Sequence, residues 1–446
     1  MHANIFIYYV RAENFMKLTW SARIFAVLVC GVVYFAAPIV LTAQDRTEPA
    51  PSSLWSLIKE GKVSAEARYR FEAFERDGAP FTATAYAPTL RLALGYETPT
   101  FHGFSALAQG AALIVTGPAD YSIPTAPSQN RPDRPSISDP RYVDLNQGYL
   151  RWTHGAQNRK LELTVGRQEI MLNDGRFISI STWRQDHQHF DAAKLKADLP
   201  WNFSFTYAYL NRVYRVMGLD ATDGKPAMHS HLLDLVWKKK EQINVSLYGV
   251  LLDFHLPALY AQSTQTFGLR ATGPYRFSKQ WSALYAAEFA NQRNFGSNPN
   301  RVNANYYLGE LGPAWHDIGV QAGYALLQGR SATDKLSTPL SHPFNGWTDL
   351  FASNPSLGNS HGLEARYLTA GGPLGFLGGT QSTIIFYDYH SDSNRIHYGR
   401  ELDIALAYRV KRVSDRWEIG WRFGRYWADH LFTNAVRTSI YTSFSL

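Results

Sequence analysis

Apolar and polar residues alternate with a period of two along most of this chain, beginning at residue 63. In the first segment the odd-numbered positions are apolar and the even-numbered positions polar: Val63, Ala65, Ala67, Tyr69 and Phe71 against Ser64, Glu66, Arg68, Arg70 and Glu72. Successive side chains of a β-strand point to opposite faces, so the pattern predicts a strand with one apolar and one polar face. The alternation recurs up to the last residues, and no convincing amphipathic helix interrupts it.

The alternating segments number roughly eighteen and are about ten residues long, the length that a tilted strand needs to cross a bilayer. The connections between them alternate between long ones, such as 116–142 and 329–360, and short ones, such as 98–102 and 276–279. The predicted strands are 63–76, 88–97, 103–115, 143–153, 160–170, 190–198, 201–212, 229–238, 241–252, 264–275, 280–292, 303–311, 316–328, 361–371, 380–390, 400–411, 414–427 and 435–446.

This rhythm predicts an all-β fold, namely a transmembrane antiparallel β-barrel of about 18 strands with long extracellular loops and short periplasmic turns. The mean hydropathy of −0.27 leaves no set of apolar helices that could span a membrane instead. Only helices and closed barrels pair every backbone polar group within hydrocarbon, so the barrel is the structure that remains. The alternative is a large soluble β-sandwich or propeller, in which strands are shorter and connections do not alternate in length.

The N-terminus has the pattern of an export signal. Lys17 and Arg23 precede an apolar run from residue 24 to residue 41, and Ala43 ends a plausible cleavage site. We therefore expect a signal peptide at 1–43, a short periplasmic segment at 44–62 and the barrel at 63–446. A transmembrane anchor is the alternative, because the run is long enough to span.

Composition excludes several kinds of chemistry. The only cysteine, Cys30, lies in the predicted signal, so the mature chain would have no disulfide, thiol catalyst or cysteine metal site. The net charge of +7 is spread along the chain instead of forming the clustered basic patch of a nucleic-acid-binding protein. No nucleophile elbow, phosphate loop or zinc-protease motif is present, so we expect no enzyme, no cofactor and no metal.

Charged residues in the middle of strands should face the lumen, because a Lys or Arg on the lipid face near the bilayer midplane costs about 2–4 kcal/mol. The basic residues predicted to face inward are Arg68, Arg70, Arg91, Arg151, Lys194, Lys196, Arg212, Arg270, Arg366, Arg409, Arg416 and Arg422. The acidic residues are Glu66, Glu72, Glu97, Glu162, Asp198, Asp234, Glu288, Glu364, Asp388, Glu401, Asp403 and Glu418. The two signs nearly balance, and many of these residues could pair across strands and stiffen the wall.

The segment from Gly166 to Asp191 is the candidate constriction, because it gathers many charged residues in and around one outer connection: Arg167, Arg176, Arg184, Asp186, His187, His189 and Asp191. Arg167 shares parity with Leu163 and Val165, so it should lie at the rim or beyond a bulge. His187, His189 and Asp191 have a spacing that can bind a metal, although a hydrogen-bonded network with Arg184 and Asp186 is the more ordinary interpretation. For an enzyme, Ser181 near His187 would be the first pair to check.

The same region resembles the alginate-export family of outer-membrane barrels. The similar pieces are NQGYLRW at 146–152, VGRQEI at 165–170, DGRF at 174–177, WRQ at 183–185, FDAA at 190–193 and YLNR at 209–212, together with the opening GKVSAEARYRFE at 61–72. The resemblance implies an 18-stranded barrel with an electropositive narrow point that guides an anionic uronate polymer outward. It also implies that Arg151, Arg167, Arg176 and Arg184 contact carboxylates and that Asp191 anchors the constriction. Arginine suits this role because its planar fork meets a carboxylate bidentately.

The favoured function is a passive outer-membrane channel for anionic polysaccharide, such as an alginate-like uronate polymer, or for other anionic solutes. The alternatives are a general or substrate-specific porin for small solutes and, less favoured, an outer-membrane enzyme. We expect Arg151, Arg176 and Arg184 to form an anion-attracting ring held by Asp186 and Asp191, and a substitution at Arg437, in the last strand, to affect selectivity much less. Expected partners are the solute, outer-membrane lipid, the barrel-assembly machinery and periplasmic polysaccharide-secretion proteins, and not nucleic acid. The predicted solute path comprises Arg68, Arg70, Arg91, Arg151, Arg167, Arg176, Arg184, Asp186, His187, His189, Asp191, Lys194 and Arg212.

Overall fold

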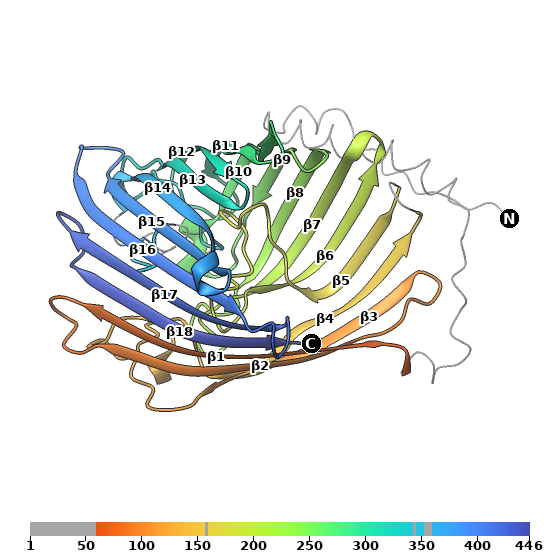
Figure 1. Cartoon of the computed structure of the whole chain (residues 1–446), viewed down its shortest axis with the longest axis horizontal. Coiled ribbons are helices and arrows are strands. Elements are labelled where there is room, and N and C mark those ends of the chain that lie inside the picture. Colours follow the sequence, from red (N-terminus) through yellow and green to blue (C-terminus); the bar gives the residue numbers. More distant parts are fainter. Residues whose placement is uncertain (1–58, 157–158, 342–344, 352–358) are drawn as a thin grey trace.

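A computed structural model describes residues 59–156, 159–341, 345–351 and 359–446. The predicted signal peptide at 1–43 and most of the segment at 44–62 lie outside the described residues. Eighteen antiparallel strands each pair with their neighbours in sequence, and β1 also pairs with β18, which closes the sheet into a barrel (Figure 1). Closure leaves no unpaired strand edge in the sheet, as a hydrocarbon environment requires.

The strands follow one another without a crossover. Their bounds are β1 (Lys62–Arg76), β2 (Ala85–Glu97), β3 (Phe104–Val115), β4 (Tyr142–His154), β5 (Leu161–Gln168), β6 (His189–Leu199), β7 (Phe203–Tyr214), β8 (Ala227–Lys239), β9 (Ile243–Leu251), β10 (Thr264–Arg276), β11 (Trp281–Asn294), β12 (Asn303–Trp315), β13 (Ile318–Leu327), β14 (Leu363–Leu374), β15 (Thr380–His390), β16 (His397–Arg409), β17 (Trp417–Ala428) and β18 (Ala435–Ser445). Short 3-10 turns are η1 (Pro127–Gln129), η2 (Pro200–Asn202), η3 (Pro257–Gln262), η4 (Asn359–His361) and η5 (Gly375–Leu377).

The predicted fold class is confirmed, since the number of strands and their order agree with the periodicity. The alternation of connection lengths is also present: 116–141, 169–188 and 328–362 join strands at one end of the barrel, and 98–103, 277–280 and 316–317 at the other. Long loops are extracellular and short turns periplasmic in barrels of this kind. No helix in the described part of the chain is both long enough and apolar enough to span a membrane.

The outer face of the barrel is apolar, as the alternation predicts. Large apolar side chains such as Leu94, Leu150 and Leu311 are exposed on this face, each by more than 60 %. Trp281 and Trp315, which face each other across β11 and β12 at the periplasmic end, are exposed as well. Aromatic side chains at this depth form the interfacial girdle that positions a barrel in its bilayer.

Part of the predicted lumen lining is wrong. Glu364, Arg366 and Asp388 share a face with the exposed Leu368 and Phe386, so they lie on the outer surface. Glu364 pairs in register with His390, and Arg366 with Asp388, near the extracellular end of the barrel. The free-energy cost of a charged side chain on the lipid face falls toward zero near the interface, so it does not keep these residues off the outer face.

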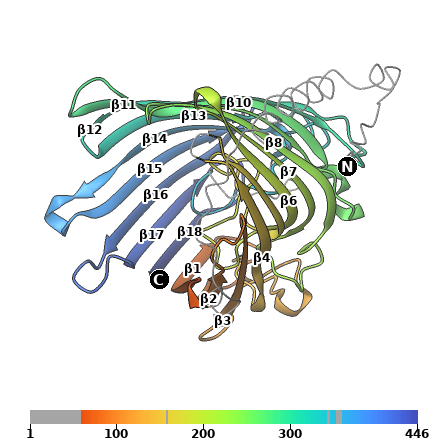
Figure 2. The same ribbon diagram turned by 90° about the vertical axis from the view of Figure 1, so that its right-hand side faces the viewer.

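The interior of the barrel is filled by its own extracellular loops. The segment between β5 and β6 and the described residues of the β13–β14 segment lie within the ring of strands (Figure 2). There Ile178 of the first forms a parallel bridge with Leu340 of the second. Phe351 packs against the inward rings of Tyr389, Tyr398 and Tyr426. This packing belongs to one buried hydrophobic cluster that joins the described loop residues to the inner wall of the barrel.

Candidate functional site

The loop between β5 and β6, residues 169–188, crosses the lumen from one wall to the other. At one end Asn173 donates a hydrogen bond of 3.1 Å to Ser246 of β9, and Asp174 forms an ion pair of 3.1 Å with Arg270 of β10. Arg270 is also paired with Glu288 of β11. The predicted constriction loop therefore folds into the barrel.

At the other end of the loop, inward-facing arginines of β1 and β2 donate to its backbone. Arg68 donates to the carbonyl oxygens of Thr182 at 2.8 Å and Arg184 at 2.5 Å. Arg91 donates to the carbonyl of Gln185 at 2.9 Å, and Arg70 donates to that of Trp183. These bonds satisfy loop carbonyls that no strand pairs, so much of the wall's positive charge positions the loop.

Beside this anchor lies a buried ion-pair cluster, which we define as Arg70, Glu72, Asp139, Arg184, Asp349 and Arg437. Glu72 is fully buried and forms ion pairs with three arginines: Arg70 at 3.3 Å, Arg184 at 3.6 Å, and Arg437, which also donates hydrogen bonds to it. Arg70 also pairs with Asp139, and Arg184 and Arg437 both pair with Asp349. Three guanidinium groups meet three carboxylates, so the cluster carries no net charge.

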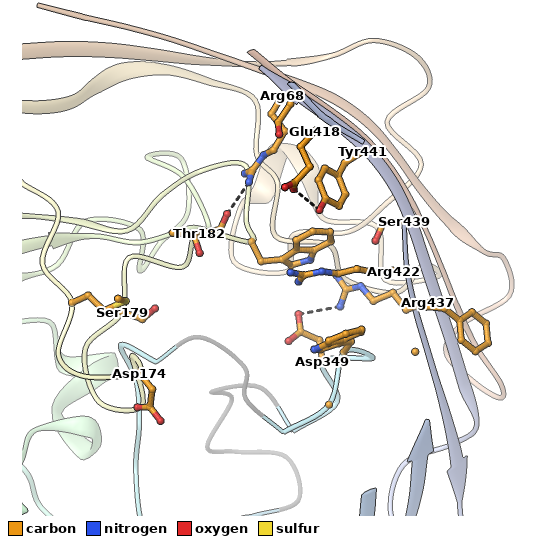
Figure 3. A pocket seen from close by; sticks show the side chains of 17 residues that line it. Arg68, Asp174, Ser179, Thr182, Asp349, Glu418, Arg422, Arg437, Ser439 and Tyr441 are labelled. Carbon is orange, nitrogen blue, oxygen red and sulfur yellow. Dashed lines mark hydrogen bonds and ion pairs between the residues drawn. The ribbon is translucent and has the colours of Figure 1, made fainter. Parts of the chain in front are cut away.

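A cavity of about 490 Å³ lies between the loop and the wall formed by β1, β17 and β18. Its lining includes Trp183 of the loop. Figure 3 shows Arg68, Arg422 and Tyr441 of the wall around it. A second cavity of about 600 Å³ lies among the extracellular loops, and Asp349 lines both cavities. We call the cavity among the extracellular loops the outer vestibule. The ion-pair cluster therefore lies between the outer vestibule and the cavity in the lumen.

Arg422 lines this cavity and contacts aromatic rings there. Its guanidinium carbon lies 3.8 Å from the ring centroid of Trp183 and 5.2 Å from that of Trp347. Among the described residues, no carboxylate forms an ion pair with Arg422 or with Arg68. The arrangement presents positive charge and an indole ring to one cavity, which suits a solute that has both a carboxylate and a flat ring face.

The predicted ring of Arg151, Arg176 and Arg184 does not form. Arg151 is at the periplasmic end of β4, where it pairs with Glu97 at 2.8 Å and Glu162 at 3.8 Å. With Lys194 it lines a smaller cavity of about 320 Å³.

Arg176 is buried at the far side of the lumen, where it lies over the ring of Tyr306 and donates to Asn345 at 3.3 Å. Arg184 belongs to the buried cluster instead. The three arginines were close in sequence, but the loop places them at different walls.

The expectation for Arg437 is also wrong. Its side chain lies in the same cluster as Arg184, because β18 closes the barrel against β1 and brings residue 437 next to Glu72. A substitution at Arg437 is therefore no remote control for one at Arg184. Ring closure of this kind joins the two ends of the sequence and has no local signal.

Arg167 and Asp191 lie on the outer face near the extracellular rim, which agrees with the parity of Arg167. They pair with each other at 3.1 Å, and Arg167 also contacts Asp144 at 3.3 Å and the ring of Tyr214 at 3.7 Å. Arg212 is opposite Asp191 in the β6–β7 register and donates to the carbonyl of Lys225. None of these contacts reaches the lumen, so the implied roles of Arg167, Asp191 and Arg212 in the solute path are not supported.

The two histidines of the loop region do not converge with Asp191. His187 contacts Glu169 at 2.9 Å, whereas His189 stacks on Tyr214. Burial lowers the pKa of His187, so its neutral form is favoured at this position. Ser181 and His187 share no hydrogen bond in the described structure, and the spacing that suggested a metal or an enzyme reflects position along the chain only.

Asp186 does not hold the arginines of the predicted ring. It is buried next to Arg91 and Tyr142, and burial raises the pKa of its carboxyl well above the usual value. The carboxylates that do hold Arg184 are Glu72 and Asp349. The period of two predicts that Glu72 and Arg422 both face the lumen, but it has no signal that one is buried and the other faces a cavity.

Comparison with known proteins gives a family and a fold. The family model described as alginate export matches residues 100–331, which is more than half of the chain. Among solved structures, Acinetobacter baumannii OccAB3 is similar with a TM-score of 0.65 and 15% identity, over 87% of this chain and 99% of that one. Pseudomonas aeruginosa OccK9 (OpdG) has a TM-score of 0.66 and 15% identity over the same shares. Pseudomonas aeruginosa OpdK, solved with vanillate, has a TM-score of 0.62 and 12% identity, over 86% of this chain and 98% of that one. No curated protein sequence matches the chain.

Proposed function

Because this chain belongs to the alginate-export family and folds as an 18-stranded outer-membrane barrel, we propose that it is a channel selecting carboxylated solutes at the cavity beside Arg422. The observation that carries the proposal is the stacking of the Arg422 guanidinium, which has no ion-pair partner among the described residues, on the indole ring of Trp183 at 3.8 Å. Fixed positive charge between low-dielectric walls raises the local concentration of anions. The indoles of Trp183 and Trp347, which both line the cavity, add apolar surface next to the charge.

The solutes named by the relatives share this chemistry. Alginate is a polymer of uronates, and vanillate is an aromatic acid, so each presents a carboxylate next to a six-membered ring. The near balance of charges on the strands argues against a uniformly anion-selective wall. Selection at one cavity requires only that the guanidinium groups there, which form no ion pair among the described residues, can reach a solute carboxylate, whatever the total charge of the wall.

The size of the cavity favours small acids or short oligouronates. A volume of about 490 Å³ is within the range of about 300–1,000 Å³ typical of small-molecule sites. The crossing loop and the buried cluster at Asp349 separate this cavity from the outer vestibule. A long uronate polymer would need both loops to move aside, so it is the second candidate, favoured by the family's description alone.

Reversal potentials across a planar bilayer test the proposal. In Arg422→Glu, the permeability ratio of anions to cations should fall by about tenfold at low salt. Replacing a positive by a negative charge beside the path raises the energy of a passing anion by about 1.4 kcal/mol or more. The effect should shrink at high salt because of screening. Block by galacturonate and benzoate should weaken in the same variant.

The matched control is Arg293→Glu, since Arg293 is exposed and shares the outward parity of Phe289 on β11. This variant should conduct as the parent does. If Arg422→Glu and Arg293→Glu both leave selectivity unchanged, the channel is a general porin and the proposal fails. If only long oligouronates block the parent, the polymer is the better candidate.

A further inference from the structure

Outside the lumen, at the extracellular end of β15 and β16, two imidazoles and a carboxylate converge. Asp388, His390 and His397 each direct one ligand atom into a volume where all three atoms lie within 4.8 Å of one another. In the part of the chain that the structure describes, this is the one group of three His, Cys, Asp or Glu residues with such geometry. We propose that these residues bind a divalent transition-metal ion.

A β-bulge brings His397 to this place. Tyr389 is opposite Gly399 and His390 is opposite His397, so Tyr398 is the extra residue of β16. Without the bulge, His397 would point to the opposite face from His390. Gly399 makes the bulge possible: its φ is +148°, and a Cβ there would lie 2.3 Å from the carbonyl oxygen of Trp427.

The donor atoms face one another directly. Nε2 of His390 lies 2.8 Å from one carboxylate oxygen of Asp388, and Nε2 of His397 lies 2.9 Å from the other. Without a metal the imidazoles donate these hydrogen bonds. A metal ion would take the place of the shared protons, receiving a nitrogen lone pair from each ring and an oxygen from Asp388.

A second carboxylate orients one of the ligands. Nδ1 of His397 lies 2.8 Å from Asp429 of the loop between β17 and β18, which leaves Nε2 as the nitrogen that faces Asp388. Carboxylates accept from metal-binding histidines in this way, fixing the tautomer and raising the basicity of the ligand nitrogen. Asp429 is therefore a positioning residue.

Neighbouring charges are compatible with a bound cation. Arg400 also contacts Asp388, at 3.1 Å, but it is more than half exposed and can turn into solvent. Glu364, opposite His390 in the register, is already paired with Arg366 at 2.7 Å. His390, His397 and Asp388 are about one quarter to one third exposed, so an ion can enter from the extracellular side.

The ligand types indicate the class of ion. Two imidazoles and one carboxylate suit Zn²⁺, Ni²⁺ or Cu²⁺, whereas Mg²⁺ and Ca²⁺ prefer sites made only of oxygen. Three protein ligands leave a coordination position for water. A bound ion would connect β15 and β16 at their extracellular ends.

Calorimetric titration of the untagged, folded chain in detergent with Zn²⁺ tests the proposal. One ion per chain should bind, and His390→Gln and His397→Gln should each weaken binding by at least about tenfold. Asp429→Asn should weaken it by about 10- to 100-fold, as the loss of an orienting carboxylate does. Mg²⁺ should not compete. Cu²⁺ added in place of Zn²⁺ should give an electron paramagnetic resonance spectrum with nitrogen ligands that is lost in the two His variants.

His255→Gln is the matched control, because His229 and His255 form another histidine pair with ring centroids 4.2 Å apart. This variant should bind Zn²⁺ as the parent does. Heat-modifiable migration and single-channel conductance should be unchanged in all variants, since the cluster lies outside the lumen, and folding is thereby checked. Unaltered Zn²⁺ affinity in the His390→Gln, His397→Gln double variant would overturn the proposal, and so would an equal loss in His255→Gln.

Discussion

Two groups of arginines lie next to each other inside the barrel, and they differ in what compensates their charge. Arg70, Arg184 and Arg437 are buried and share the carboxylates of Glu72, Asp139 and Asp349. Arg422 faces a cavity and has indole rings as its nearest partners instead. The sequence predicts Arg70 and Arg422 to face the lumen and Arg184 to lie in the constriction, and it gives Arg437 no such role.

This difference separates arginines that stabilise the fold from an arginine that acts on solutes. A buried guanidinium that loses its partner leaves an unpaired charge in a low-dielectric environment, so the first group should control folding of the loop. A cation that faces a water-filled cavity acts on passing ions, so the second group should control selectivity. The predictions below test this separation, beginning with the largest expected effect.

Glu72→Gln should give the largest loss of stability, because Glu72 is fully buried and pairs with three arginines. Removing one partner of a buried ion pair costs about 3–5 kcal/mol. Urea unfolding followed by the heat-modifiable band shift should show this loss. Glu418→Gln is the control, since the Glu418 side chain is about one third exposed, accepts from Tyr441 at 2.9 Å and lies 4.0 Å from the exposed Arg409. Equal stability of the two variants would contradict a structural role for the cluster.

Arg184→Gln should mainly change stability, whereas Arg422→Gln should mainly change ion selectivity. The first should lower the free energy of unfolding by a few kcal/mol and leave the reversal potential of the folded channel nearly unchanged. The second should shift the reversal potential toward cations with little change in stability. Both quantities should be measured for both variants. A selectivity shift of the same size in each would mean that the charge effect is spread over the whole wall.

Trp183→Leu should weaken block by benzoate and galacturonate while leaving selectivity for chloride close to that of the parent. The indole contributes a ring face, worth about 0.5–1 kcal/mol for such contacts, or roughly two- to fivefold in affinity. Concentration dependence of the block in single-channel recordings measures it. Block by acetate, which has no ring, is the control and should not change. Loss of acetate block to the same extent would indicate that the loop has moved.

Asp186→Asn should have the smallest effect, visible only in the pH dependence of stability. Burial raises the pKa of Asp186 in the folded state, so the folded chain holds that proton more tightly than the unfolded chain does. The stability that this carboxyl contributes is therefore fully present below its pKa in the unfolded chain, about 3.9. This contribution decreases as the pH rises toward its pKa in the folded chain. Asn cannot ionise, so the variant should lose this part of the decrease in urea unfolding measured from pH 4 to pH 8. An identical pH profile in parent and variant would show that Asp186 is not buried in solution.

The sequence by itself determined the barrel. A period of two fixes which side chains face lipid, and the length of each segment fixes how the strands span, since both follow from local backbone geometry. The strand β18, predicted at 435–446, ends at Ser445, and β1, predicted at 63–76, begins at Lys62. The rhythm of long and short connections needs no knowledge of packing either.

Only the tertiary structure decided which charges meet. Glu72 and Arg437 are 365 positions apart and come together because the barrel closes. Arg176 and Arg184 are close in sequence, but the crossing loop carries them to different walls, and the bulge at Tyr398 turns His397 onto the face of His390. Ion pairs and ligand clusters depend on distances across the lumen or between strands, and no local pattern specifies those distances.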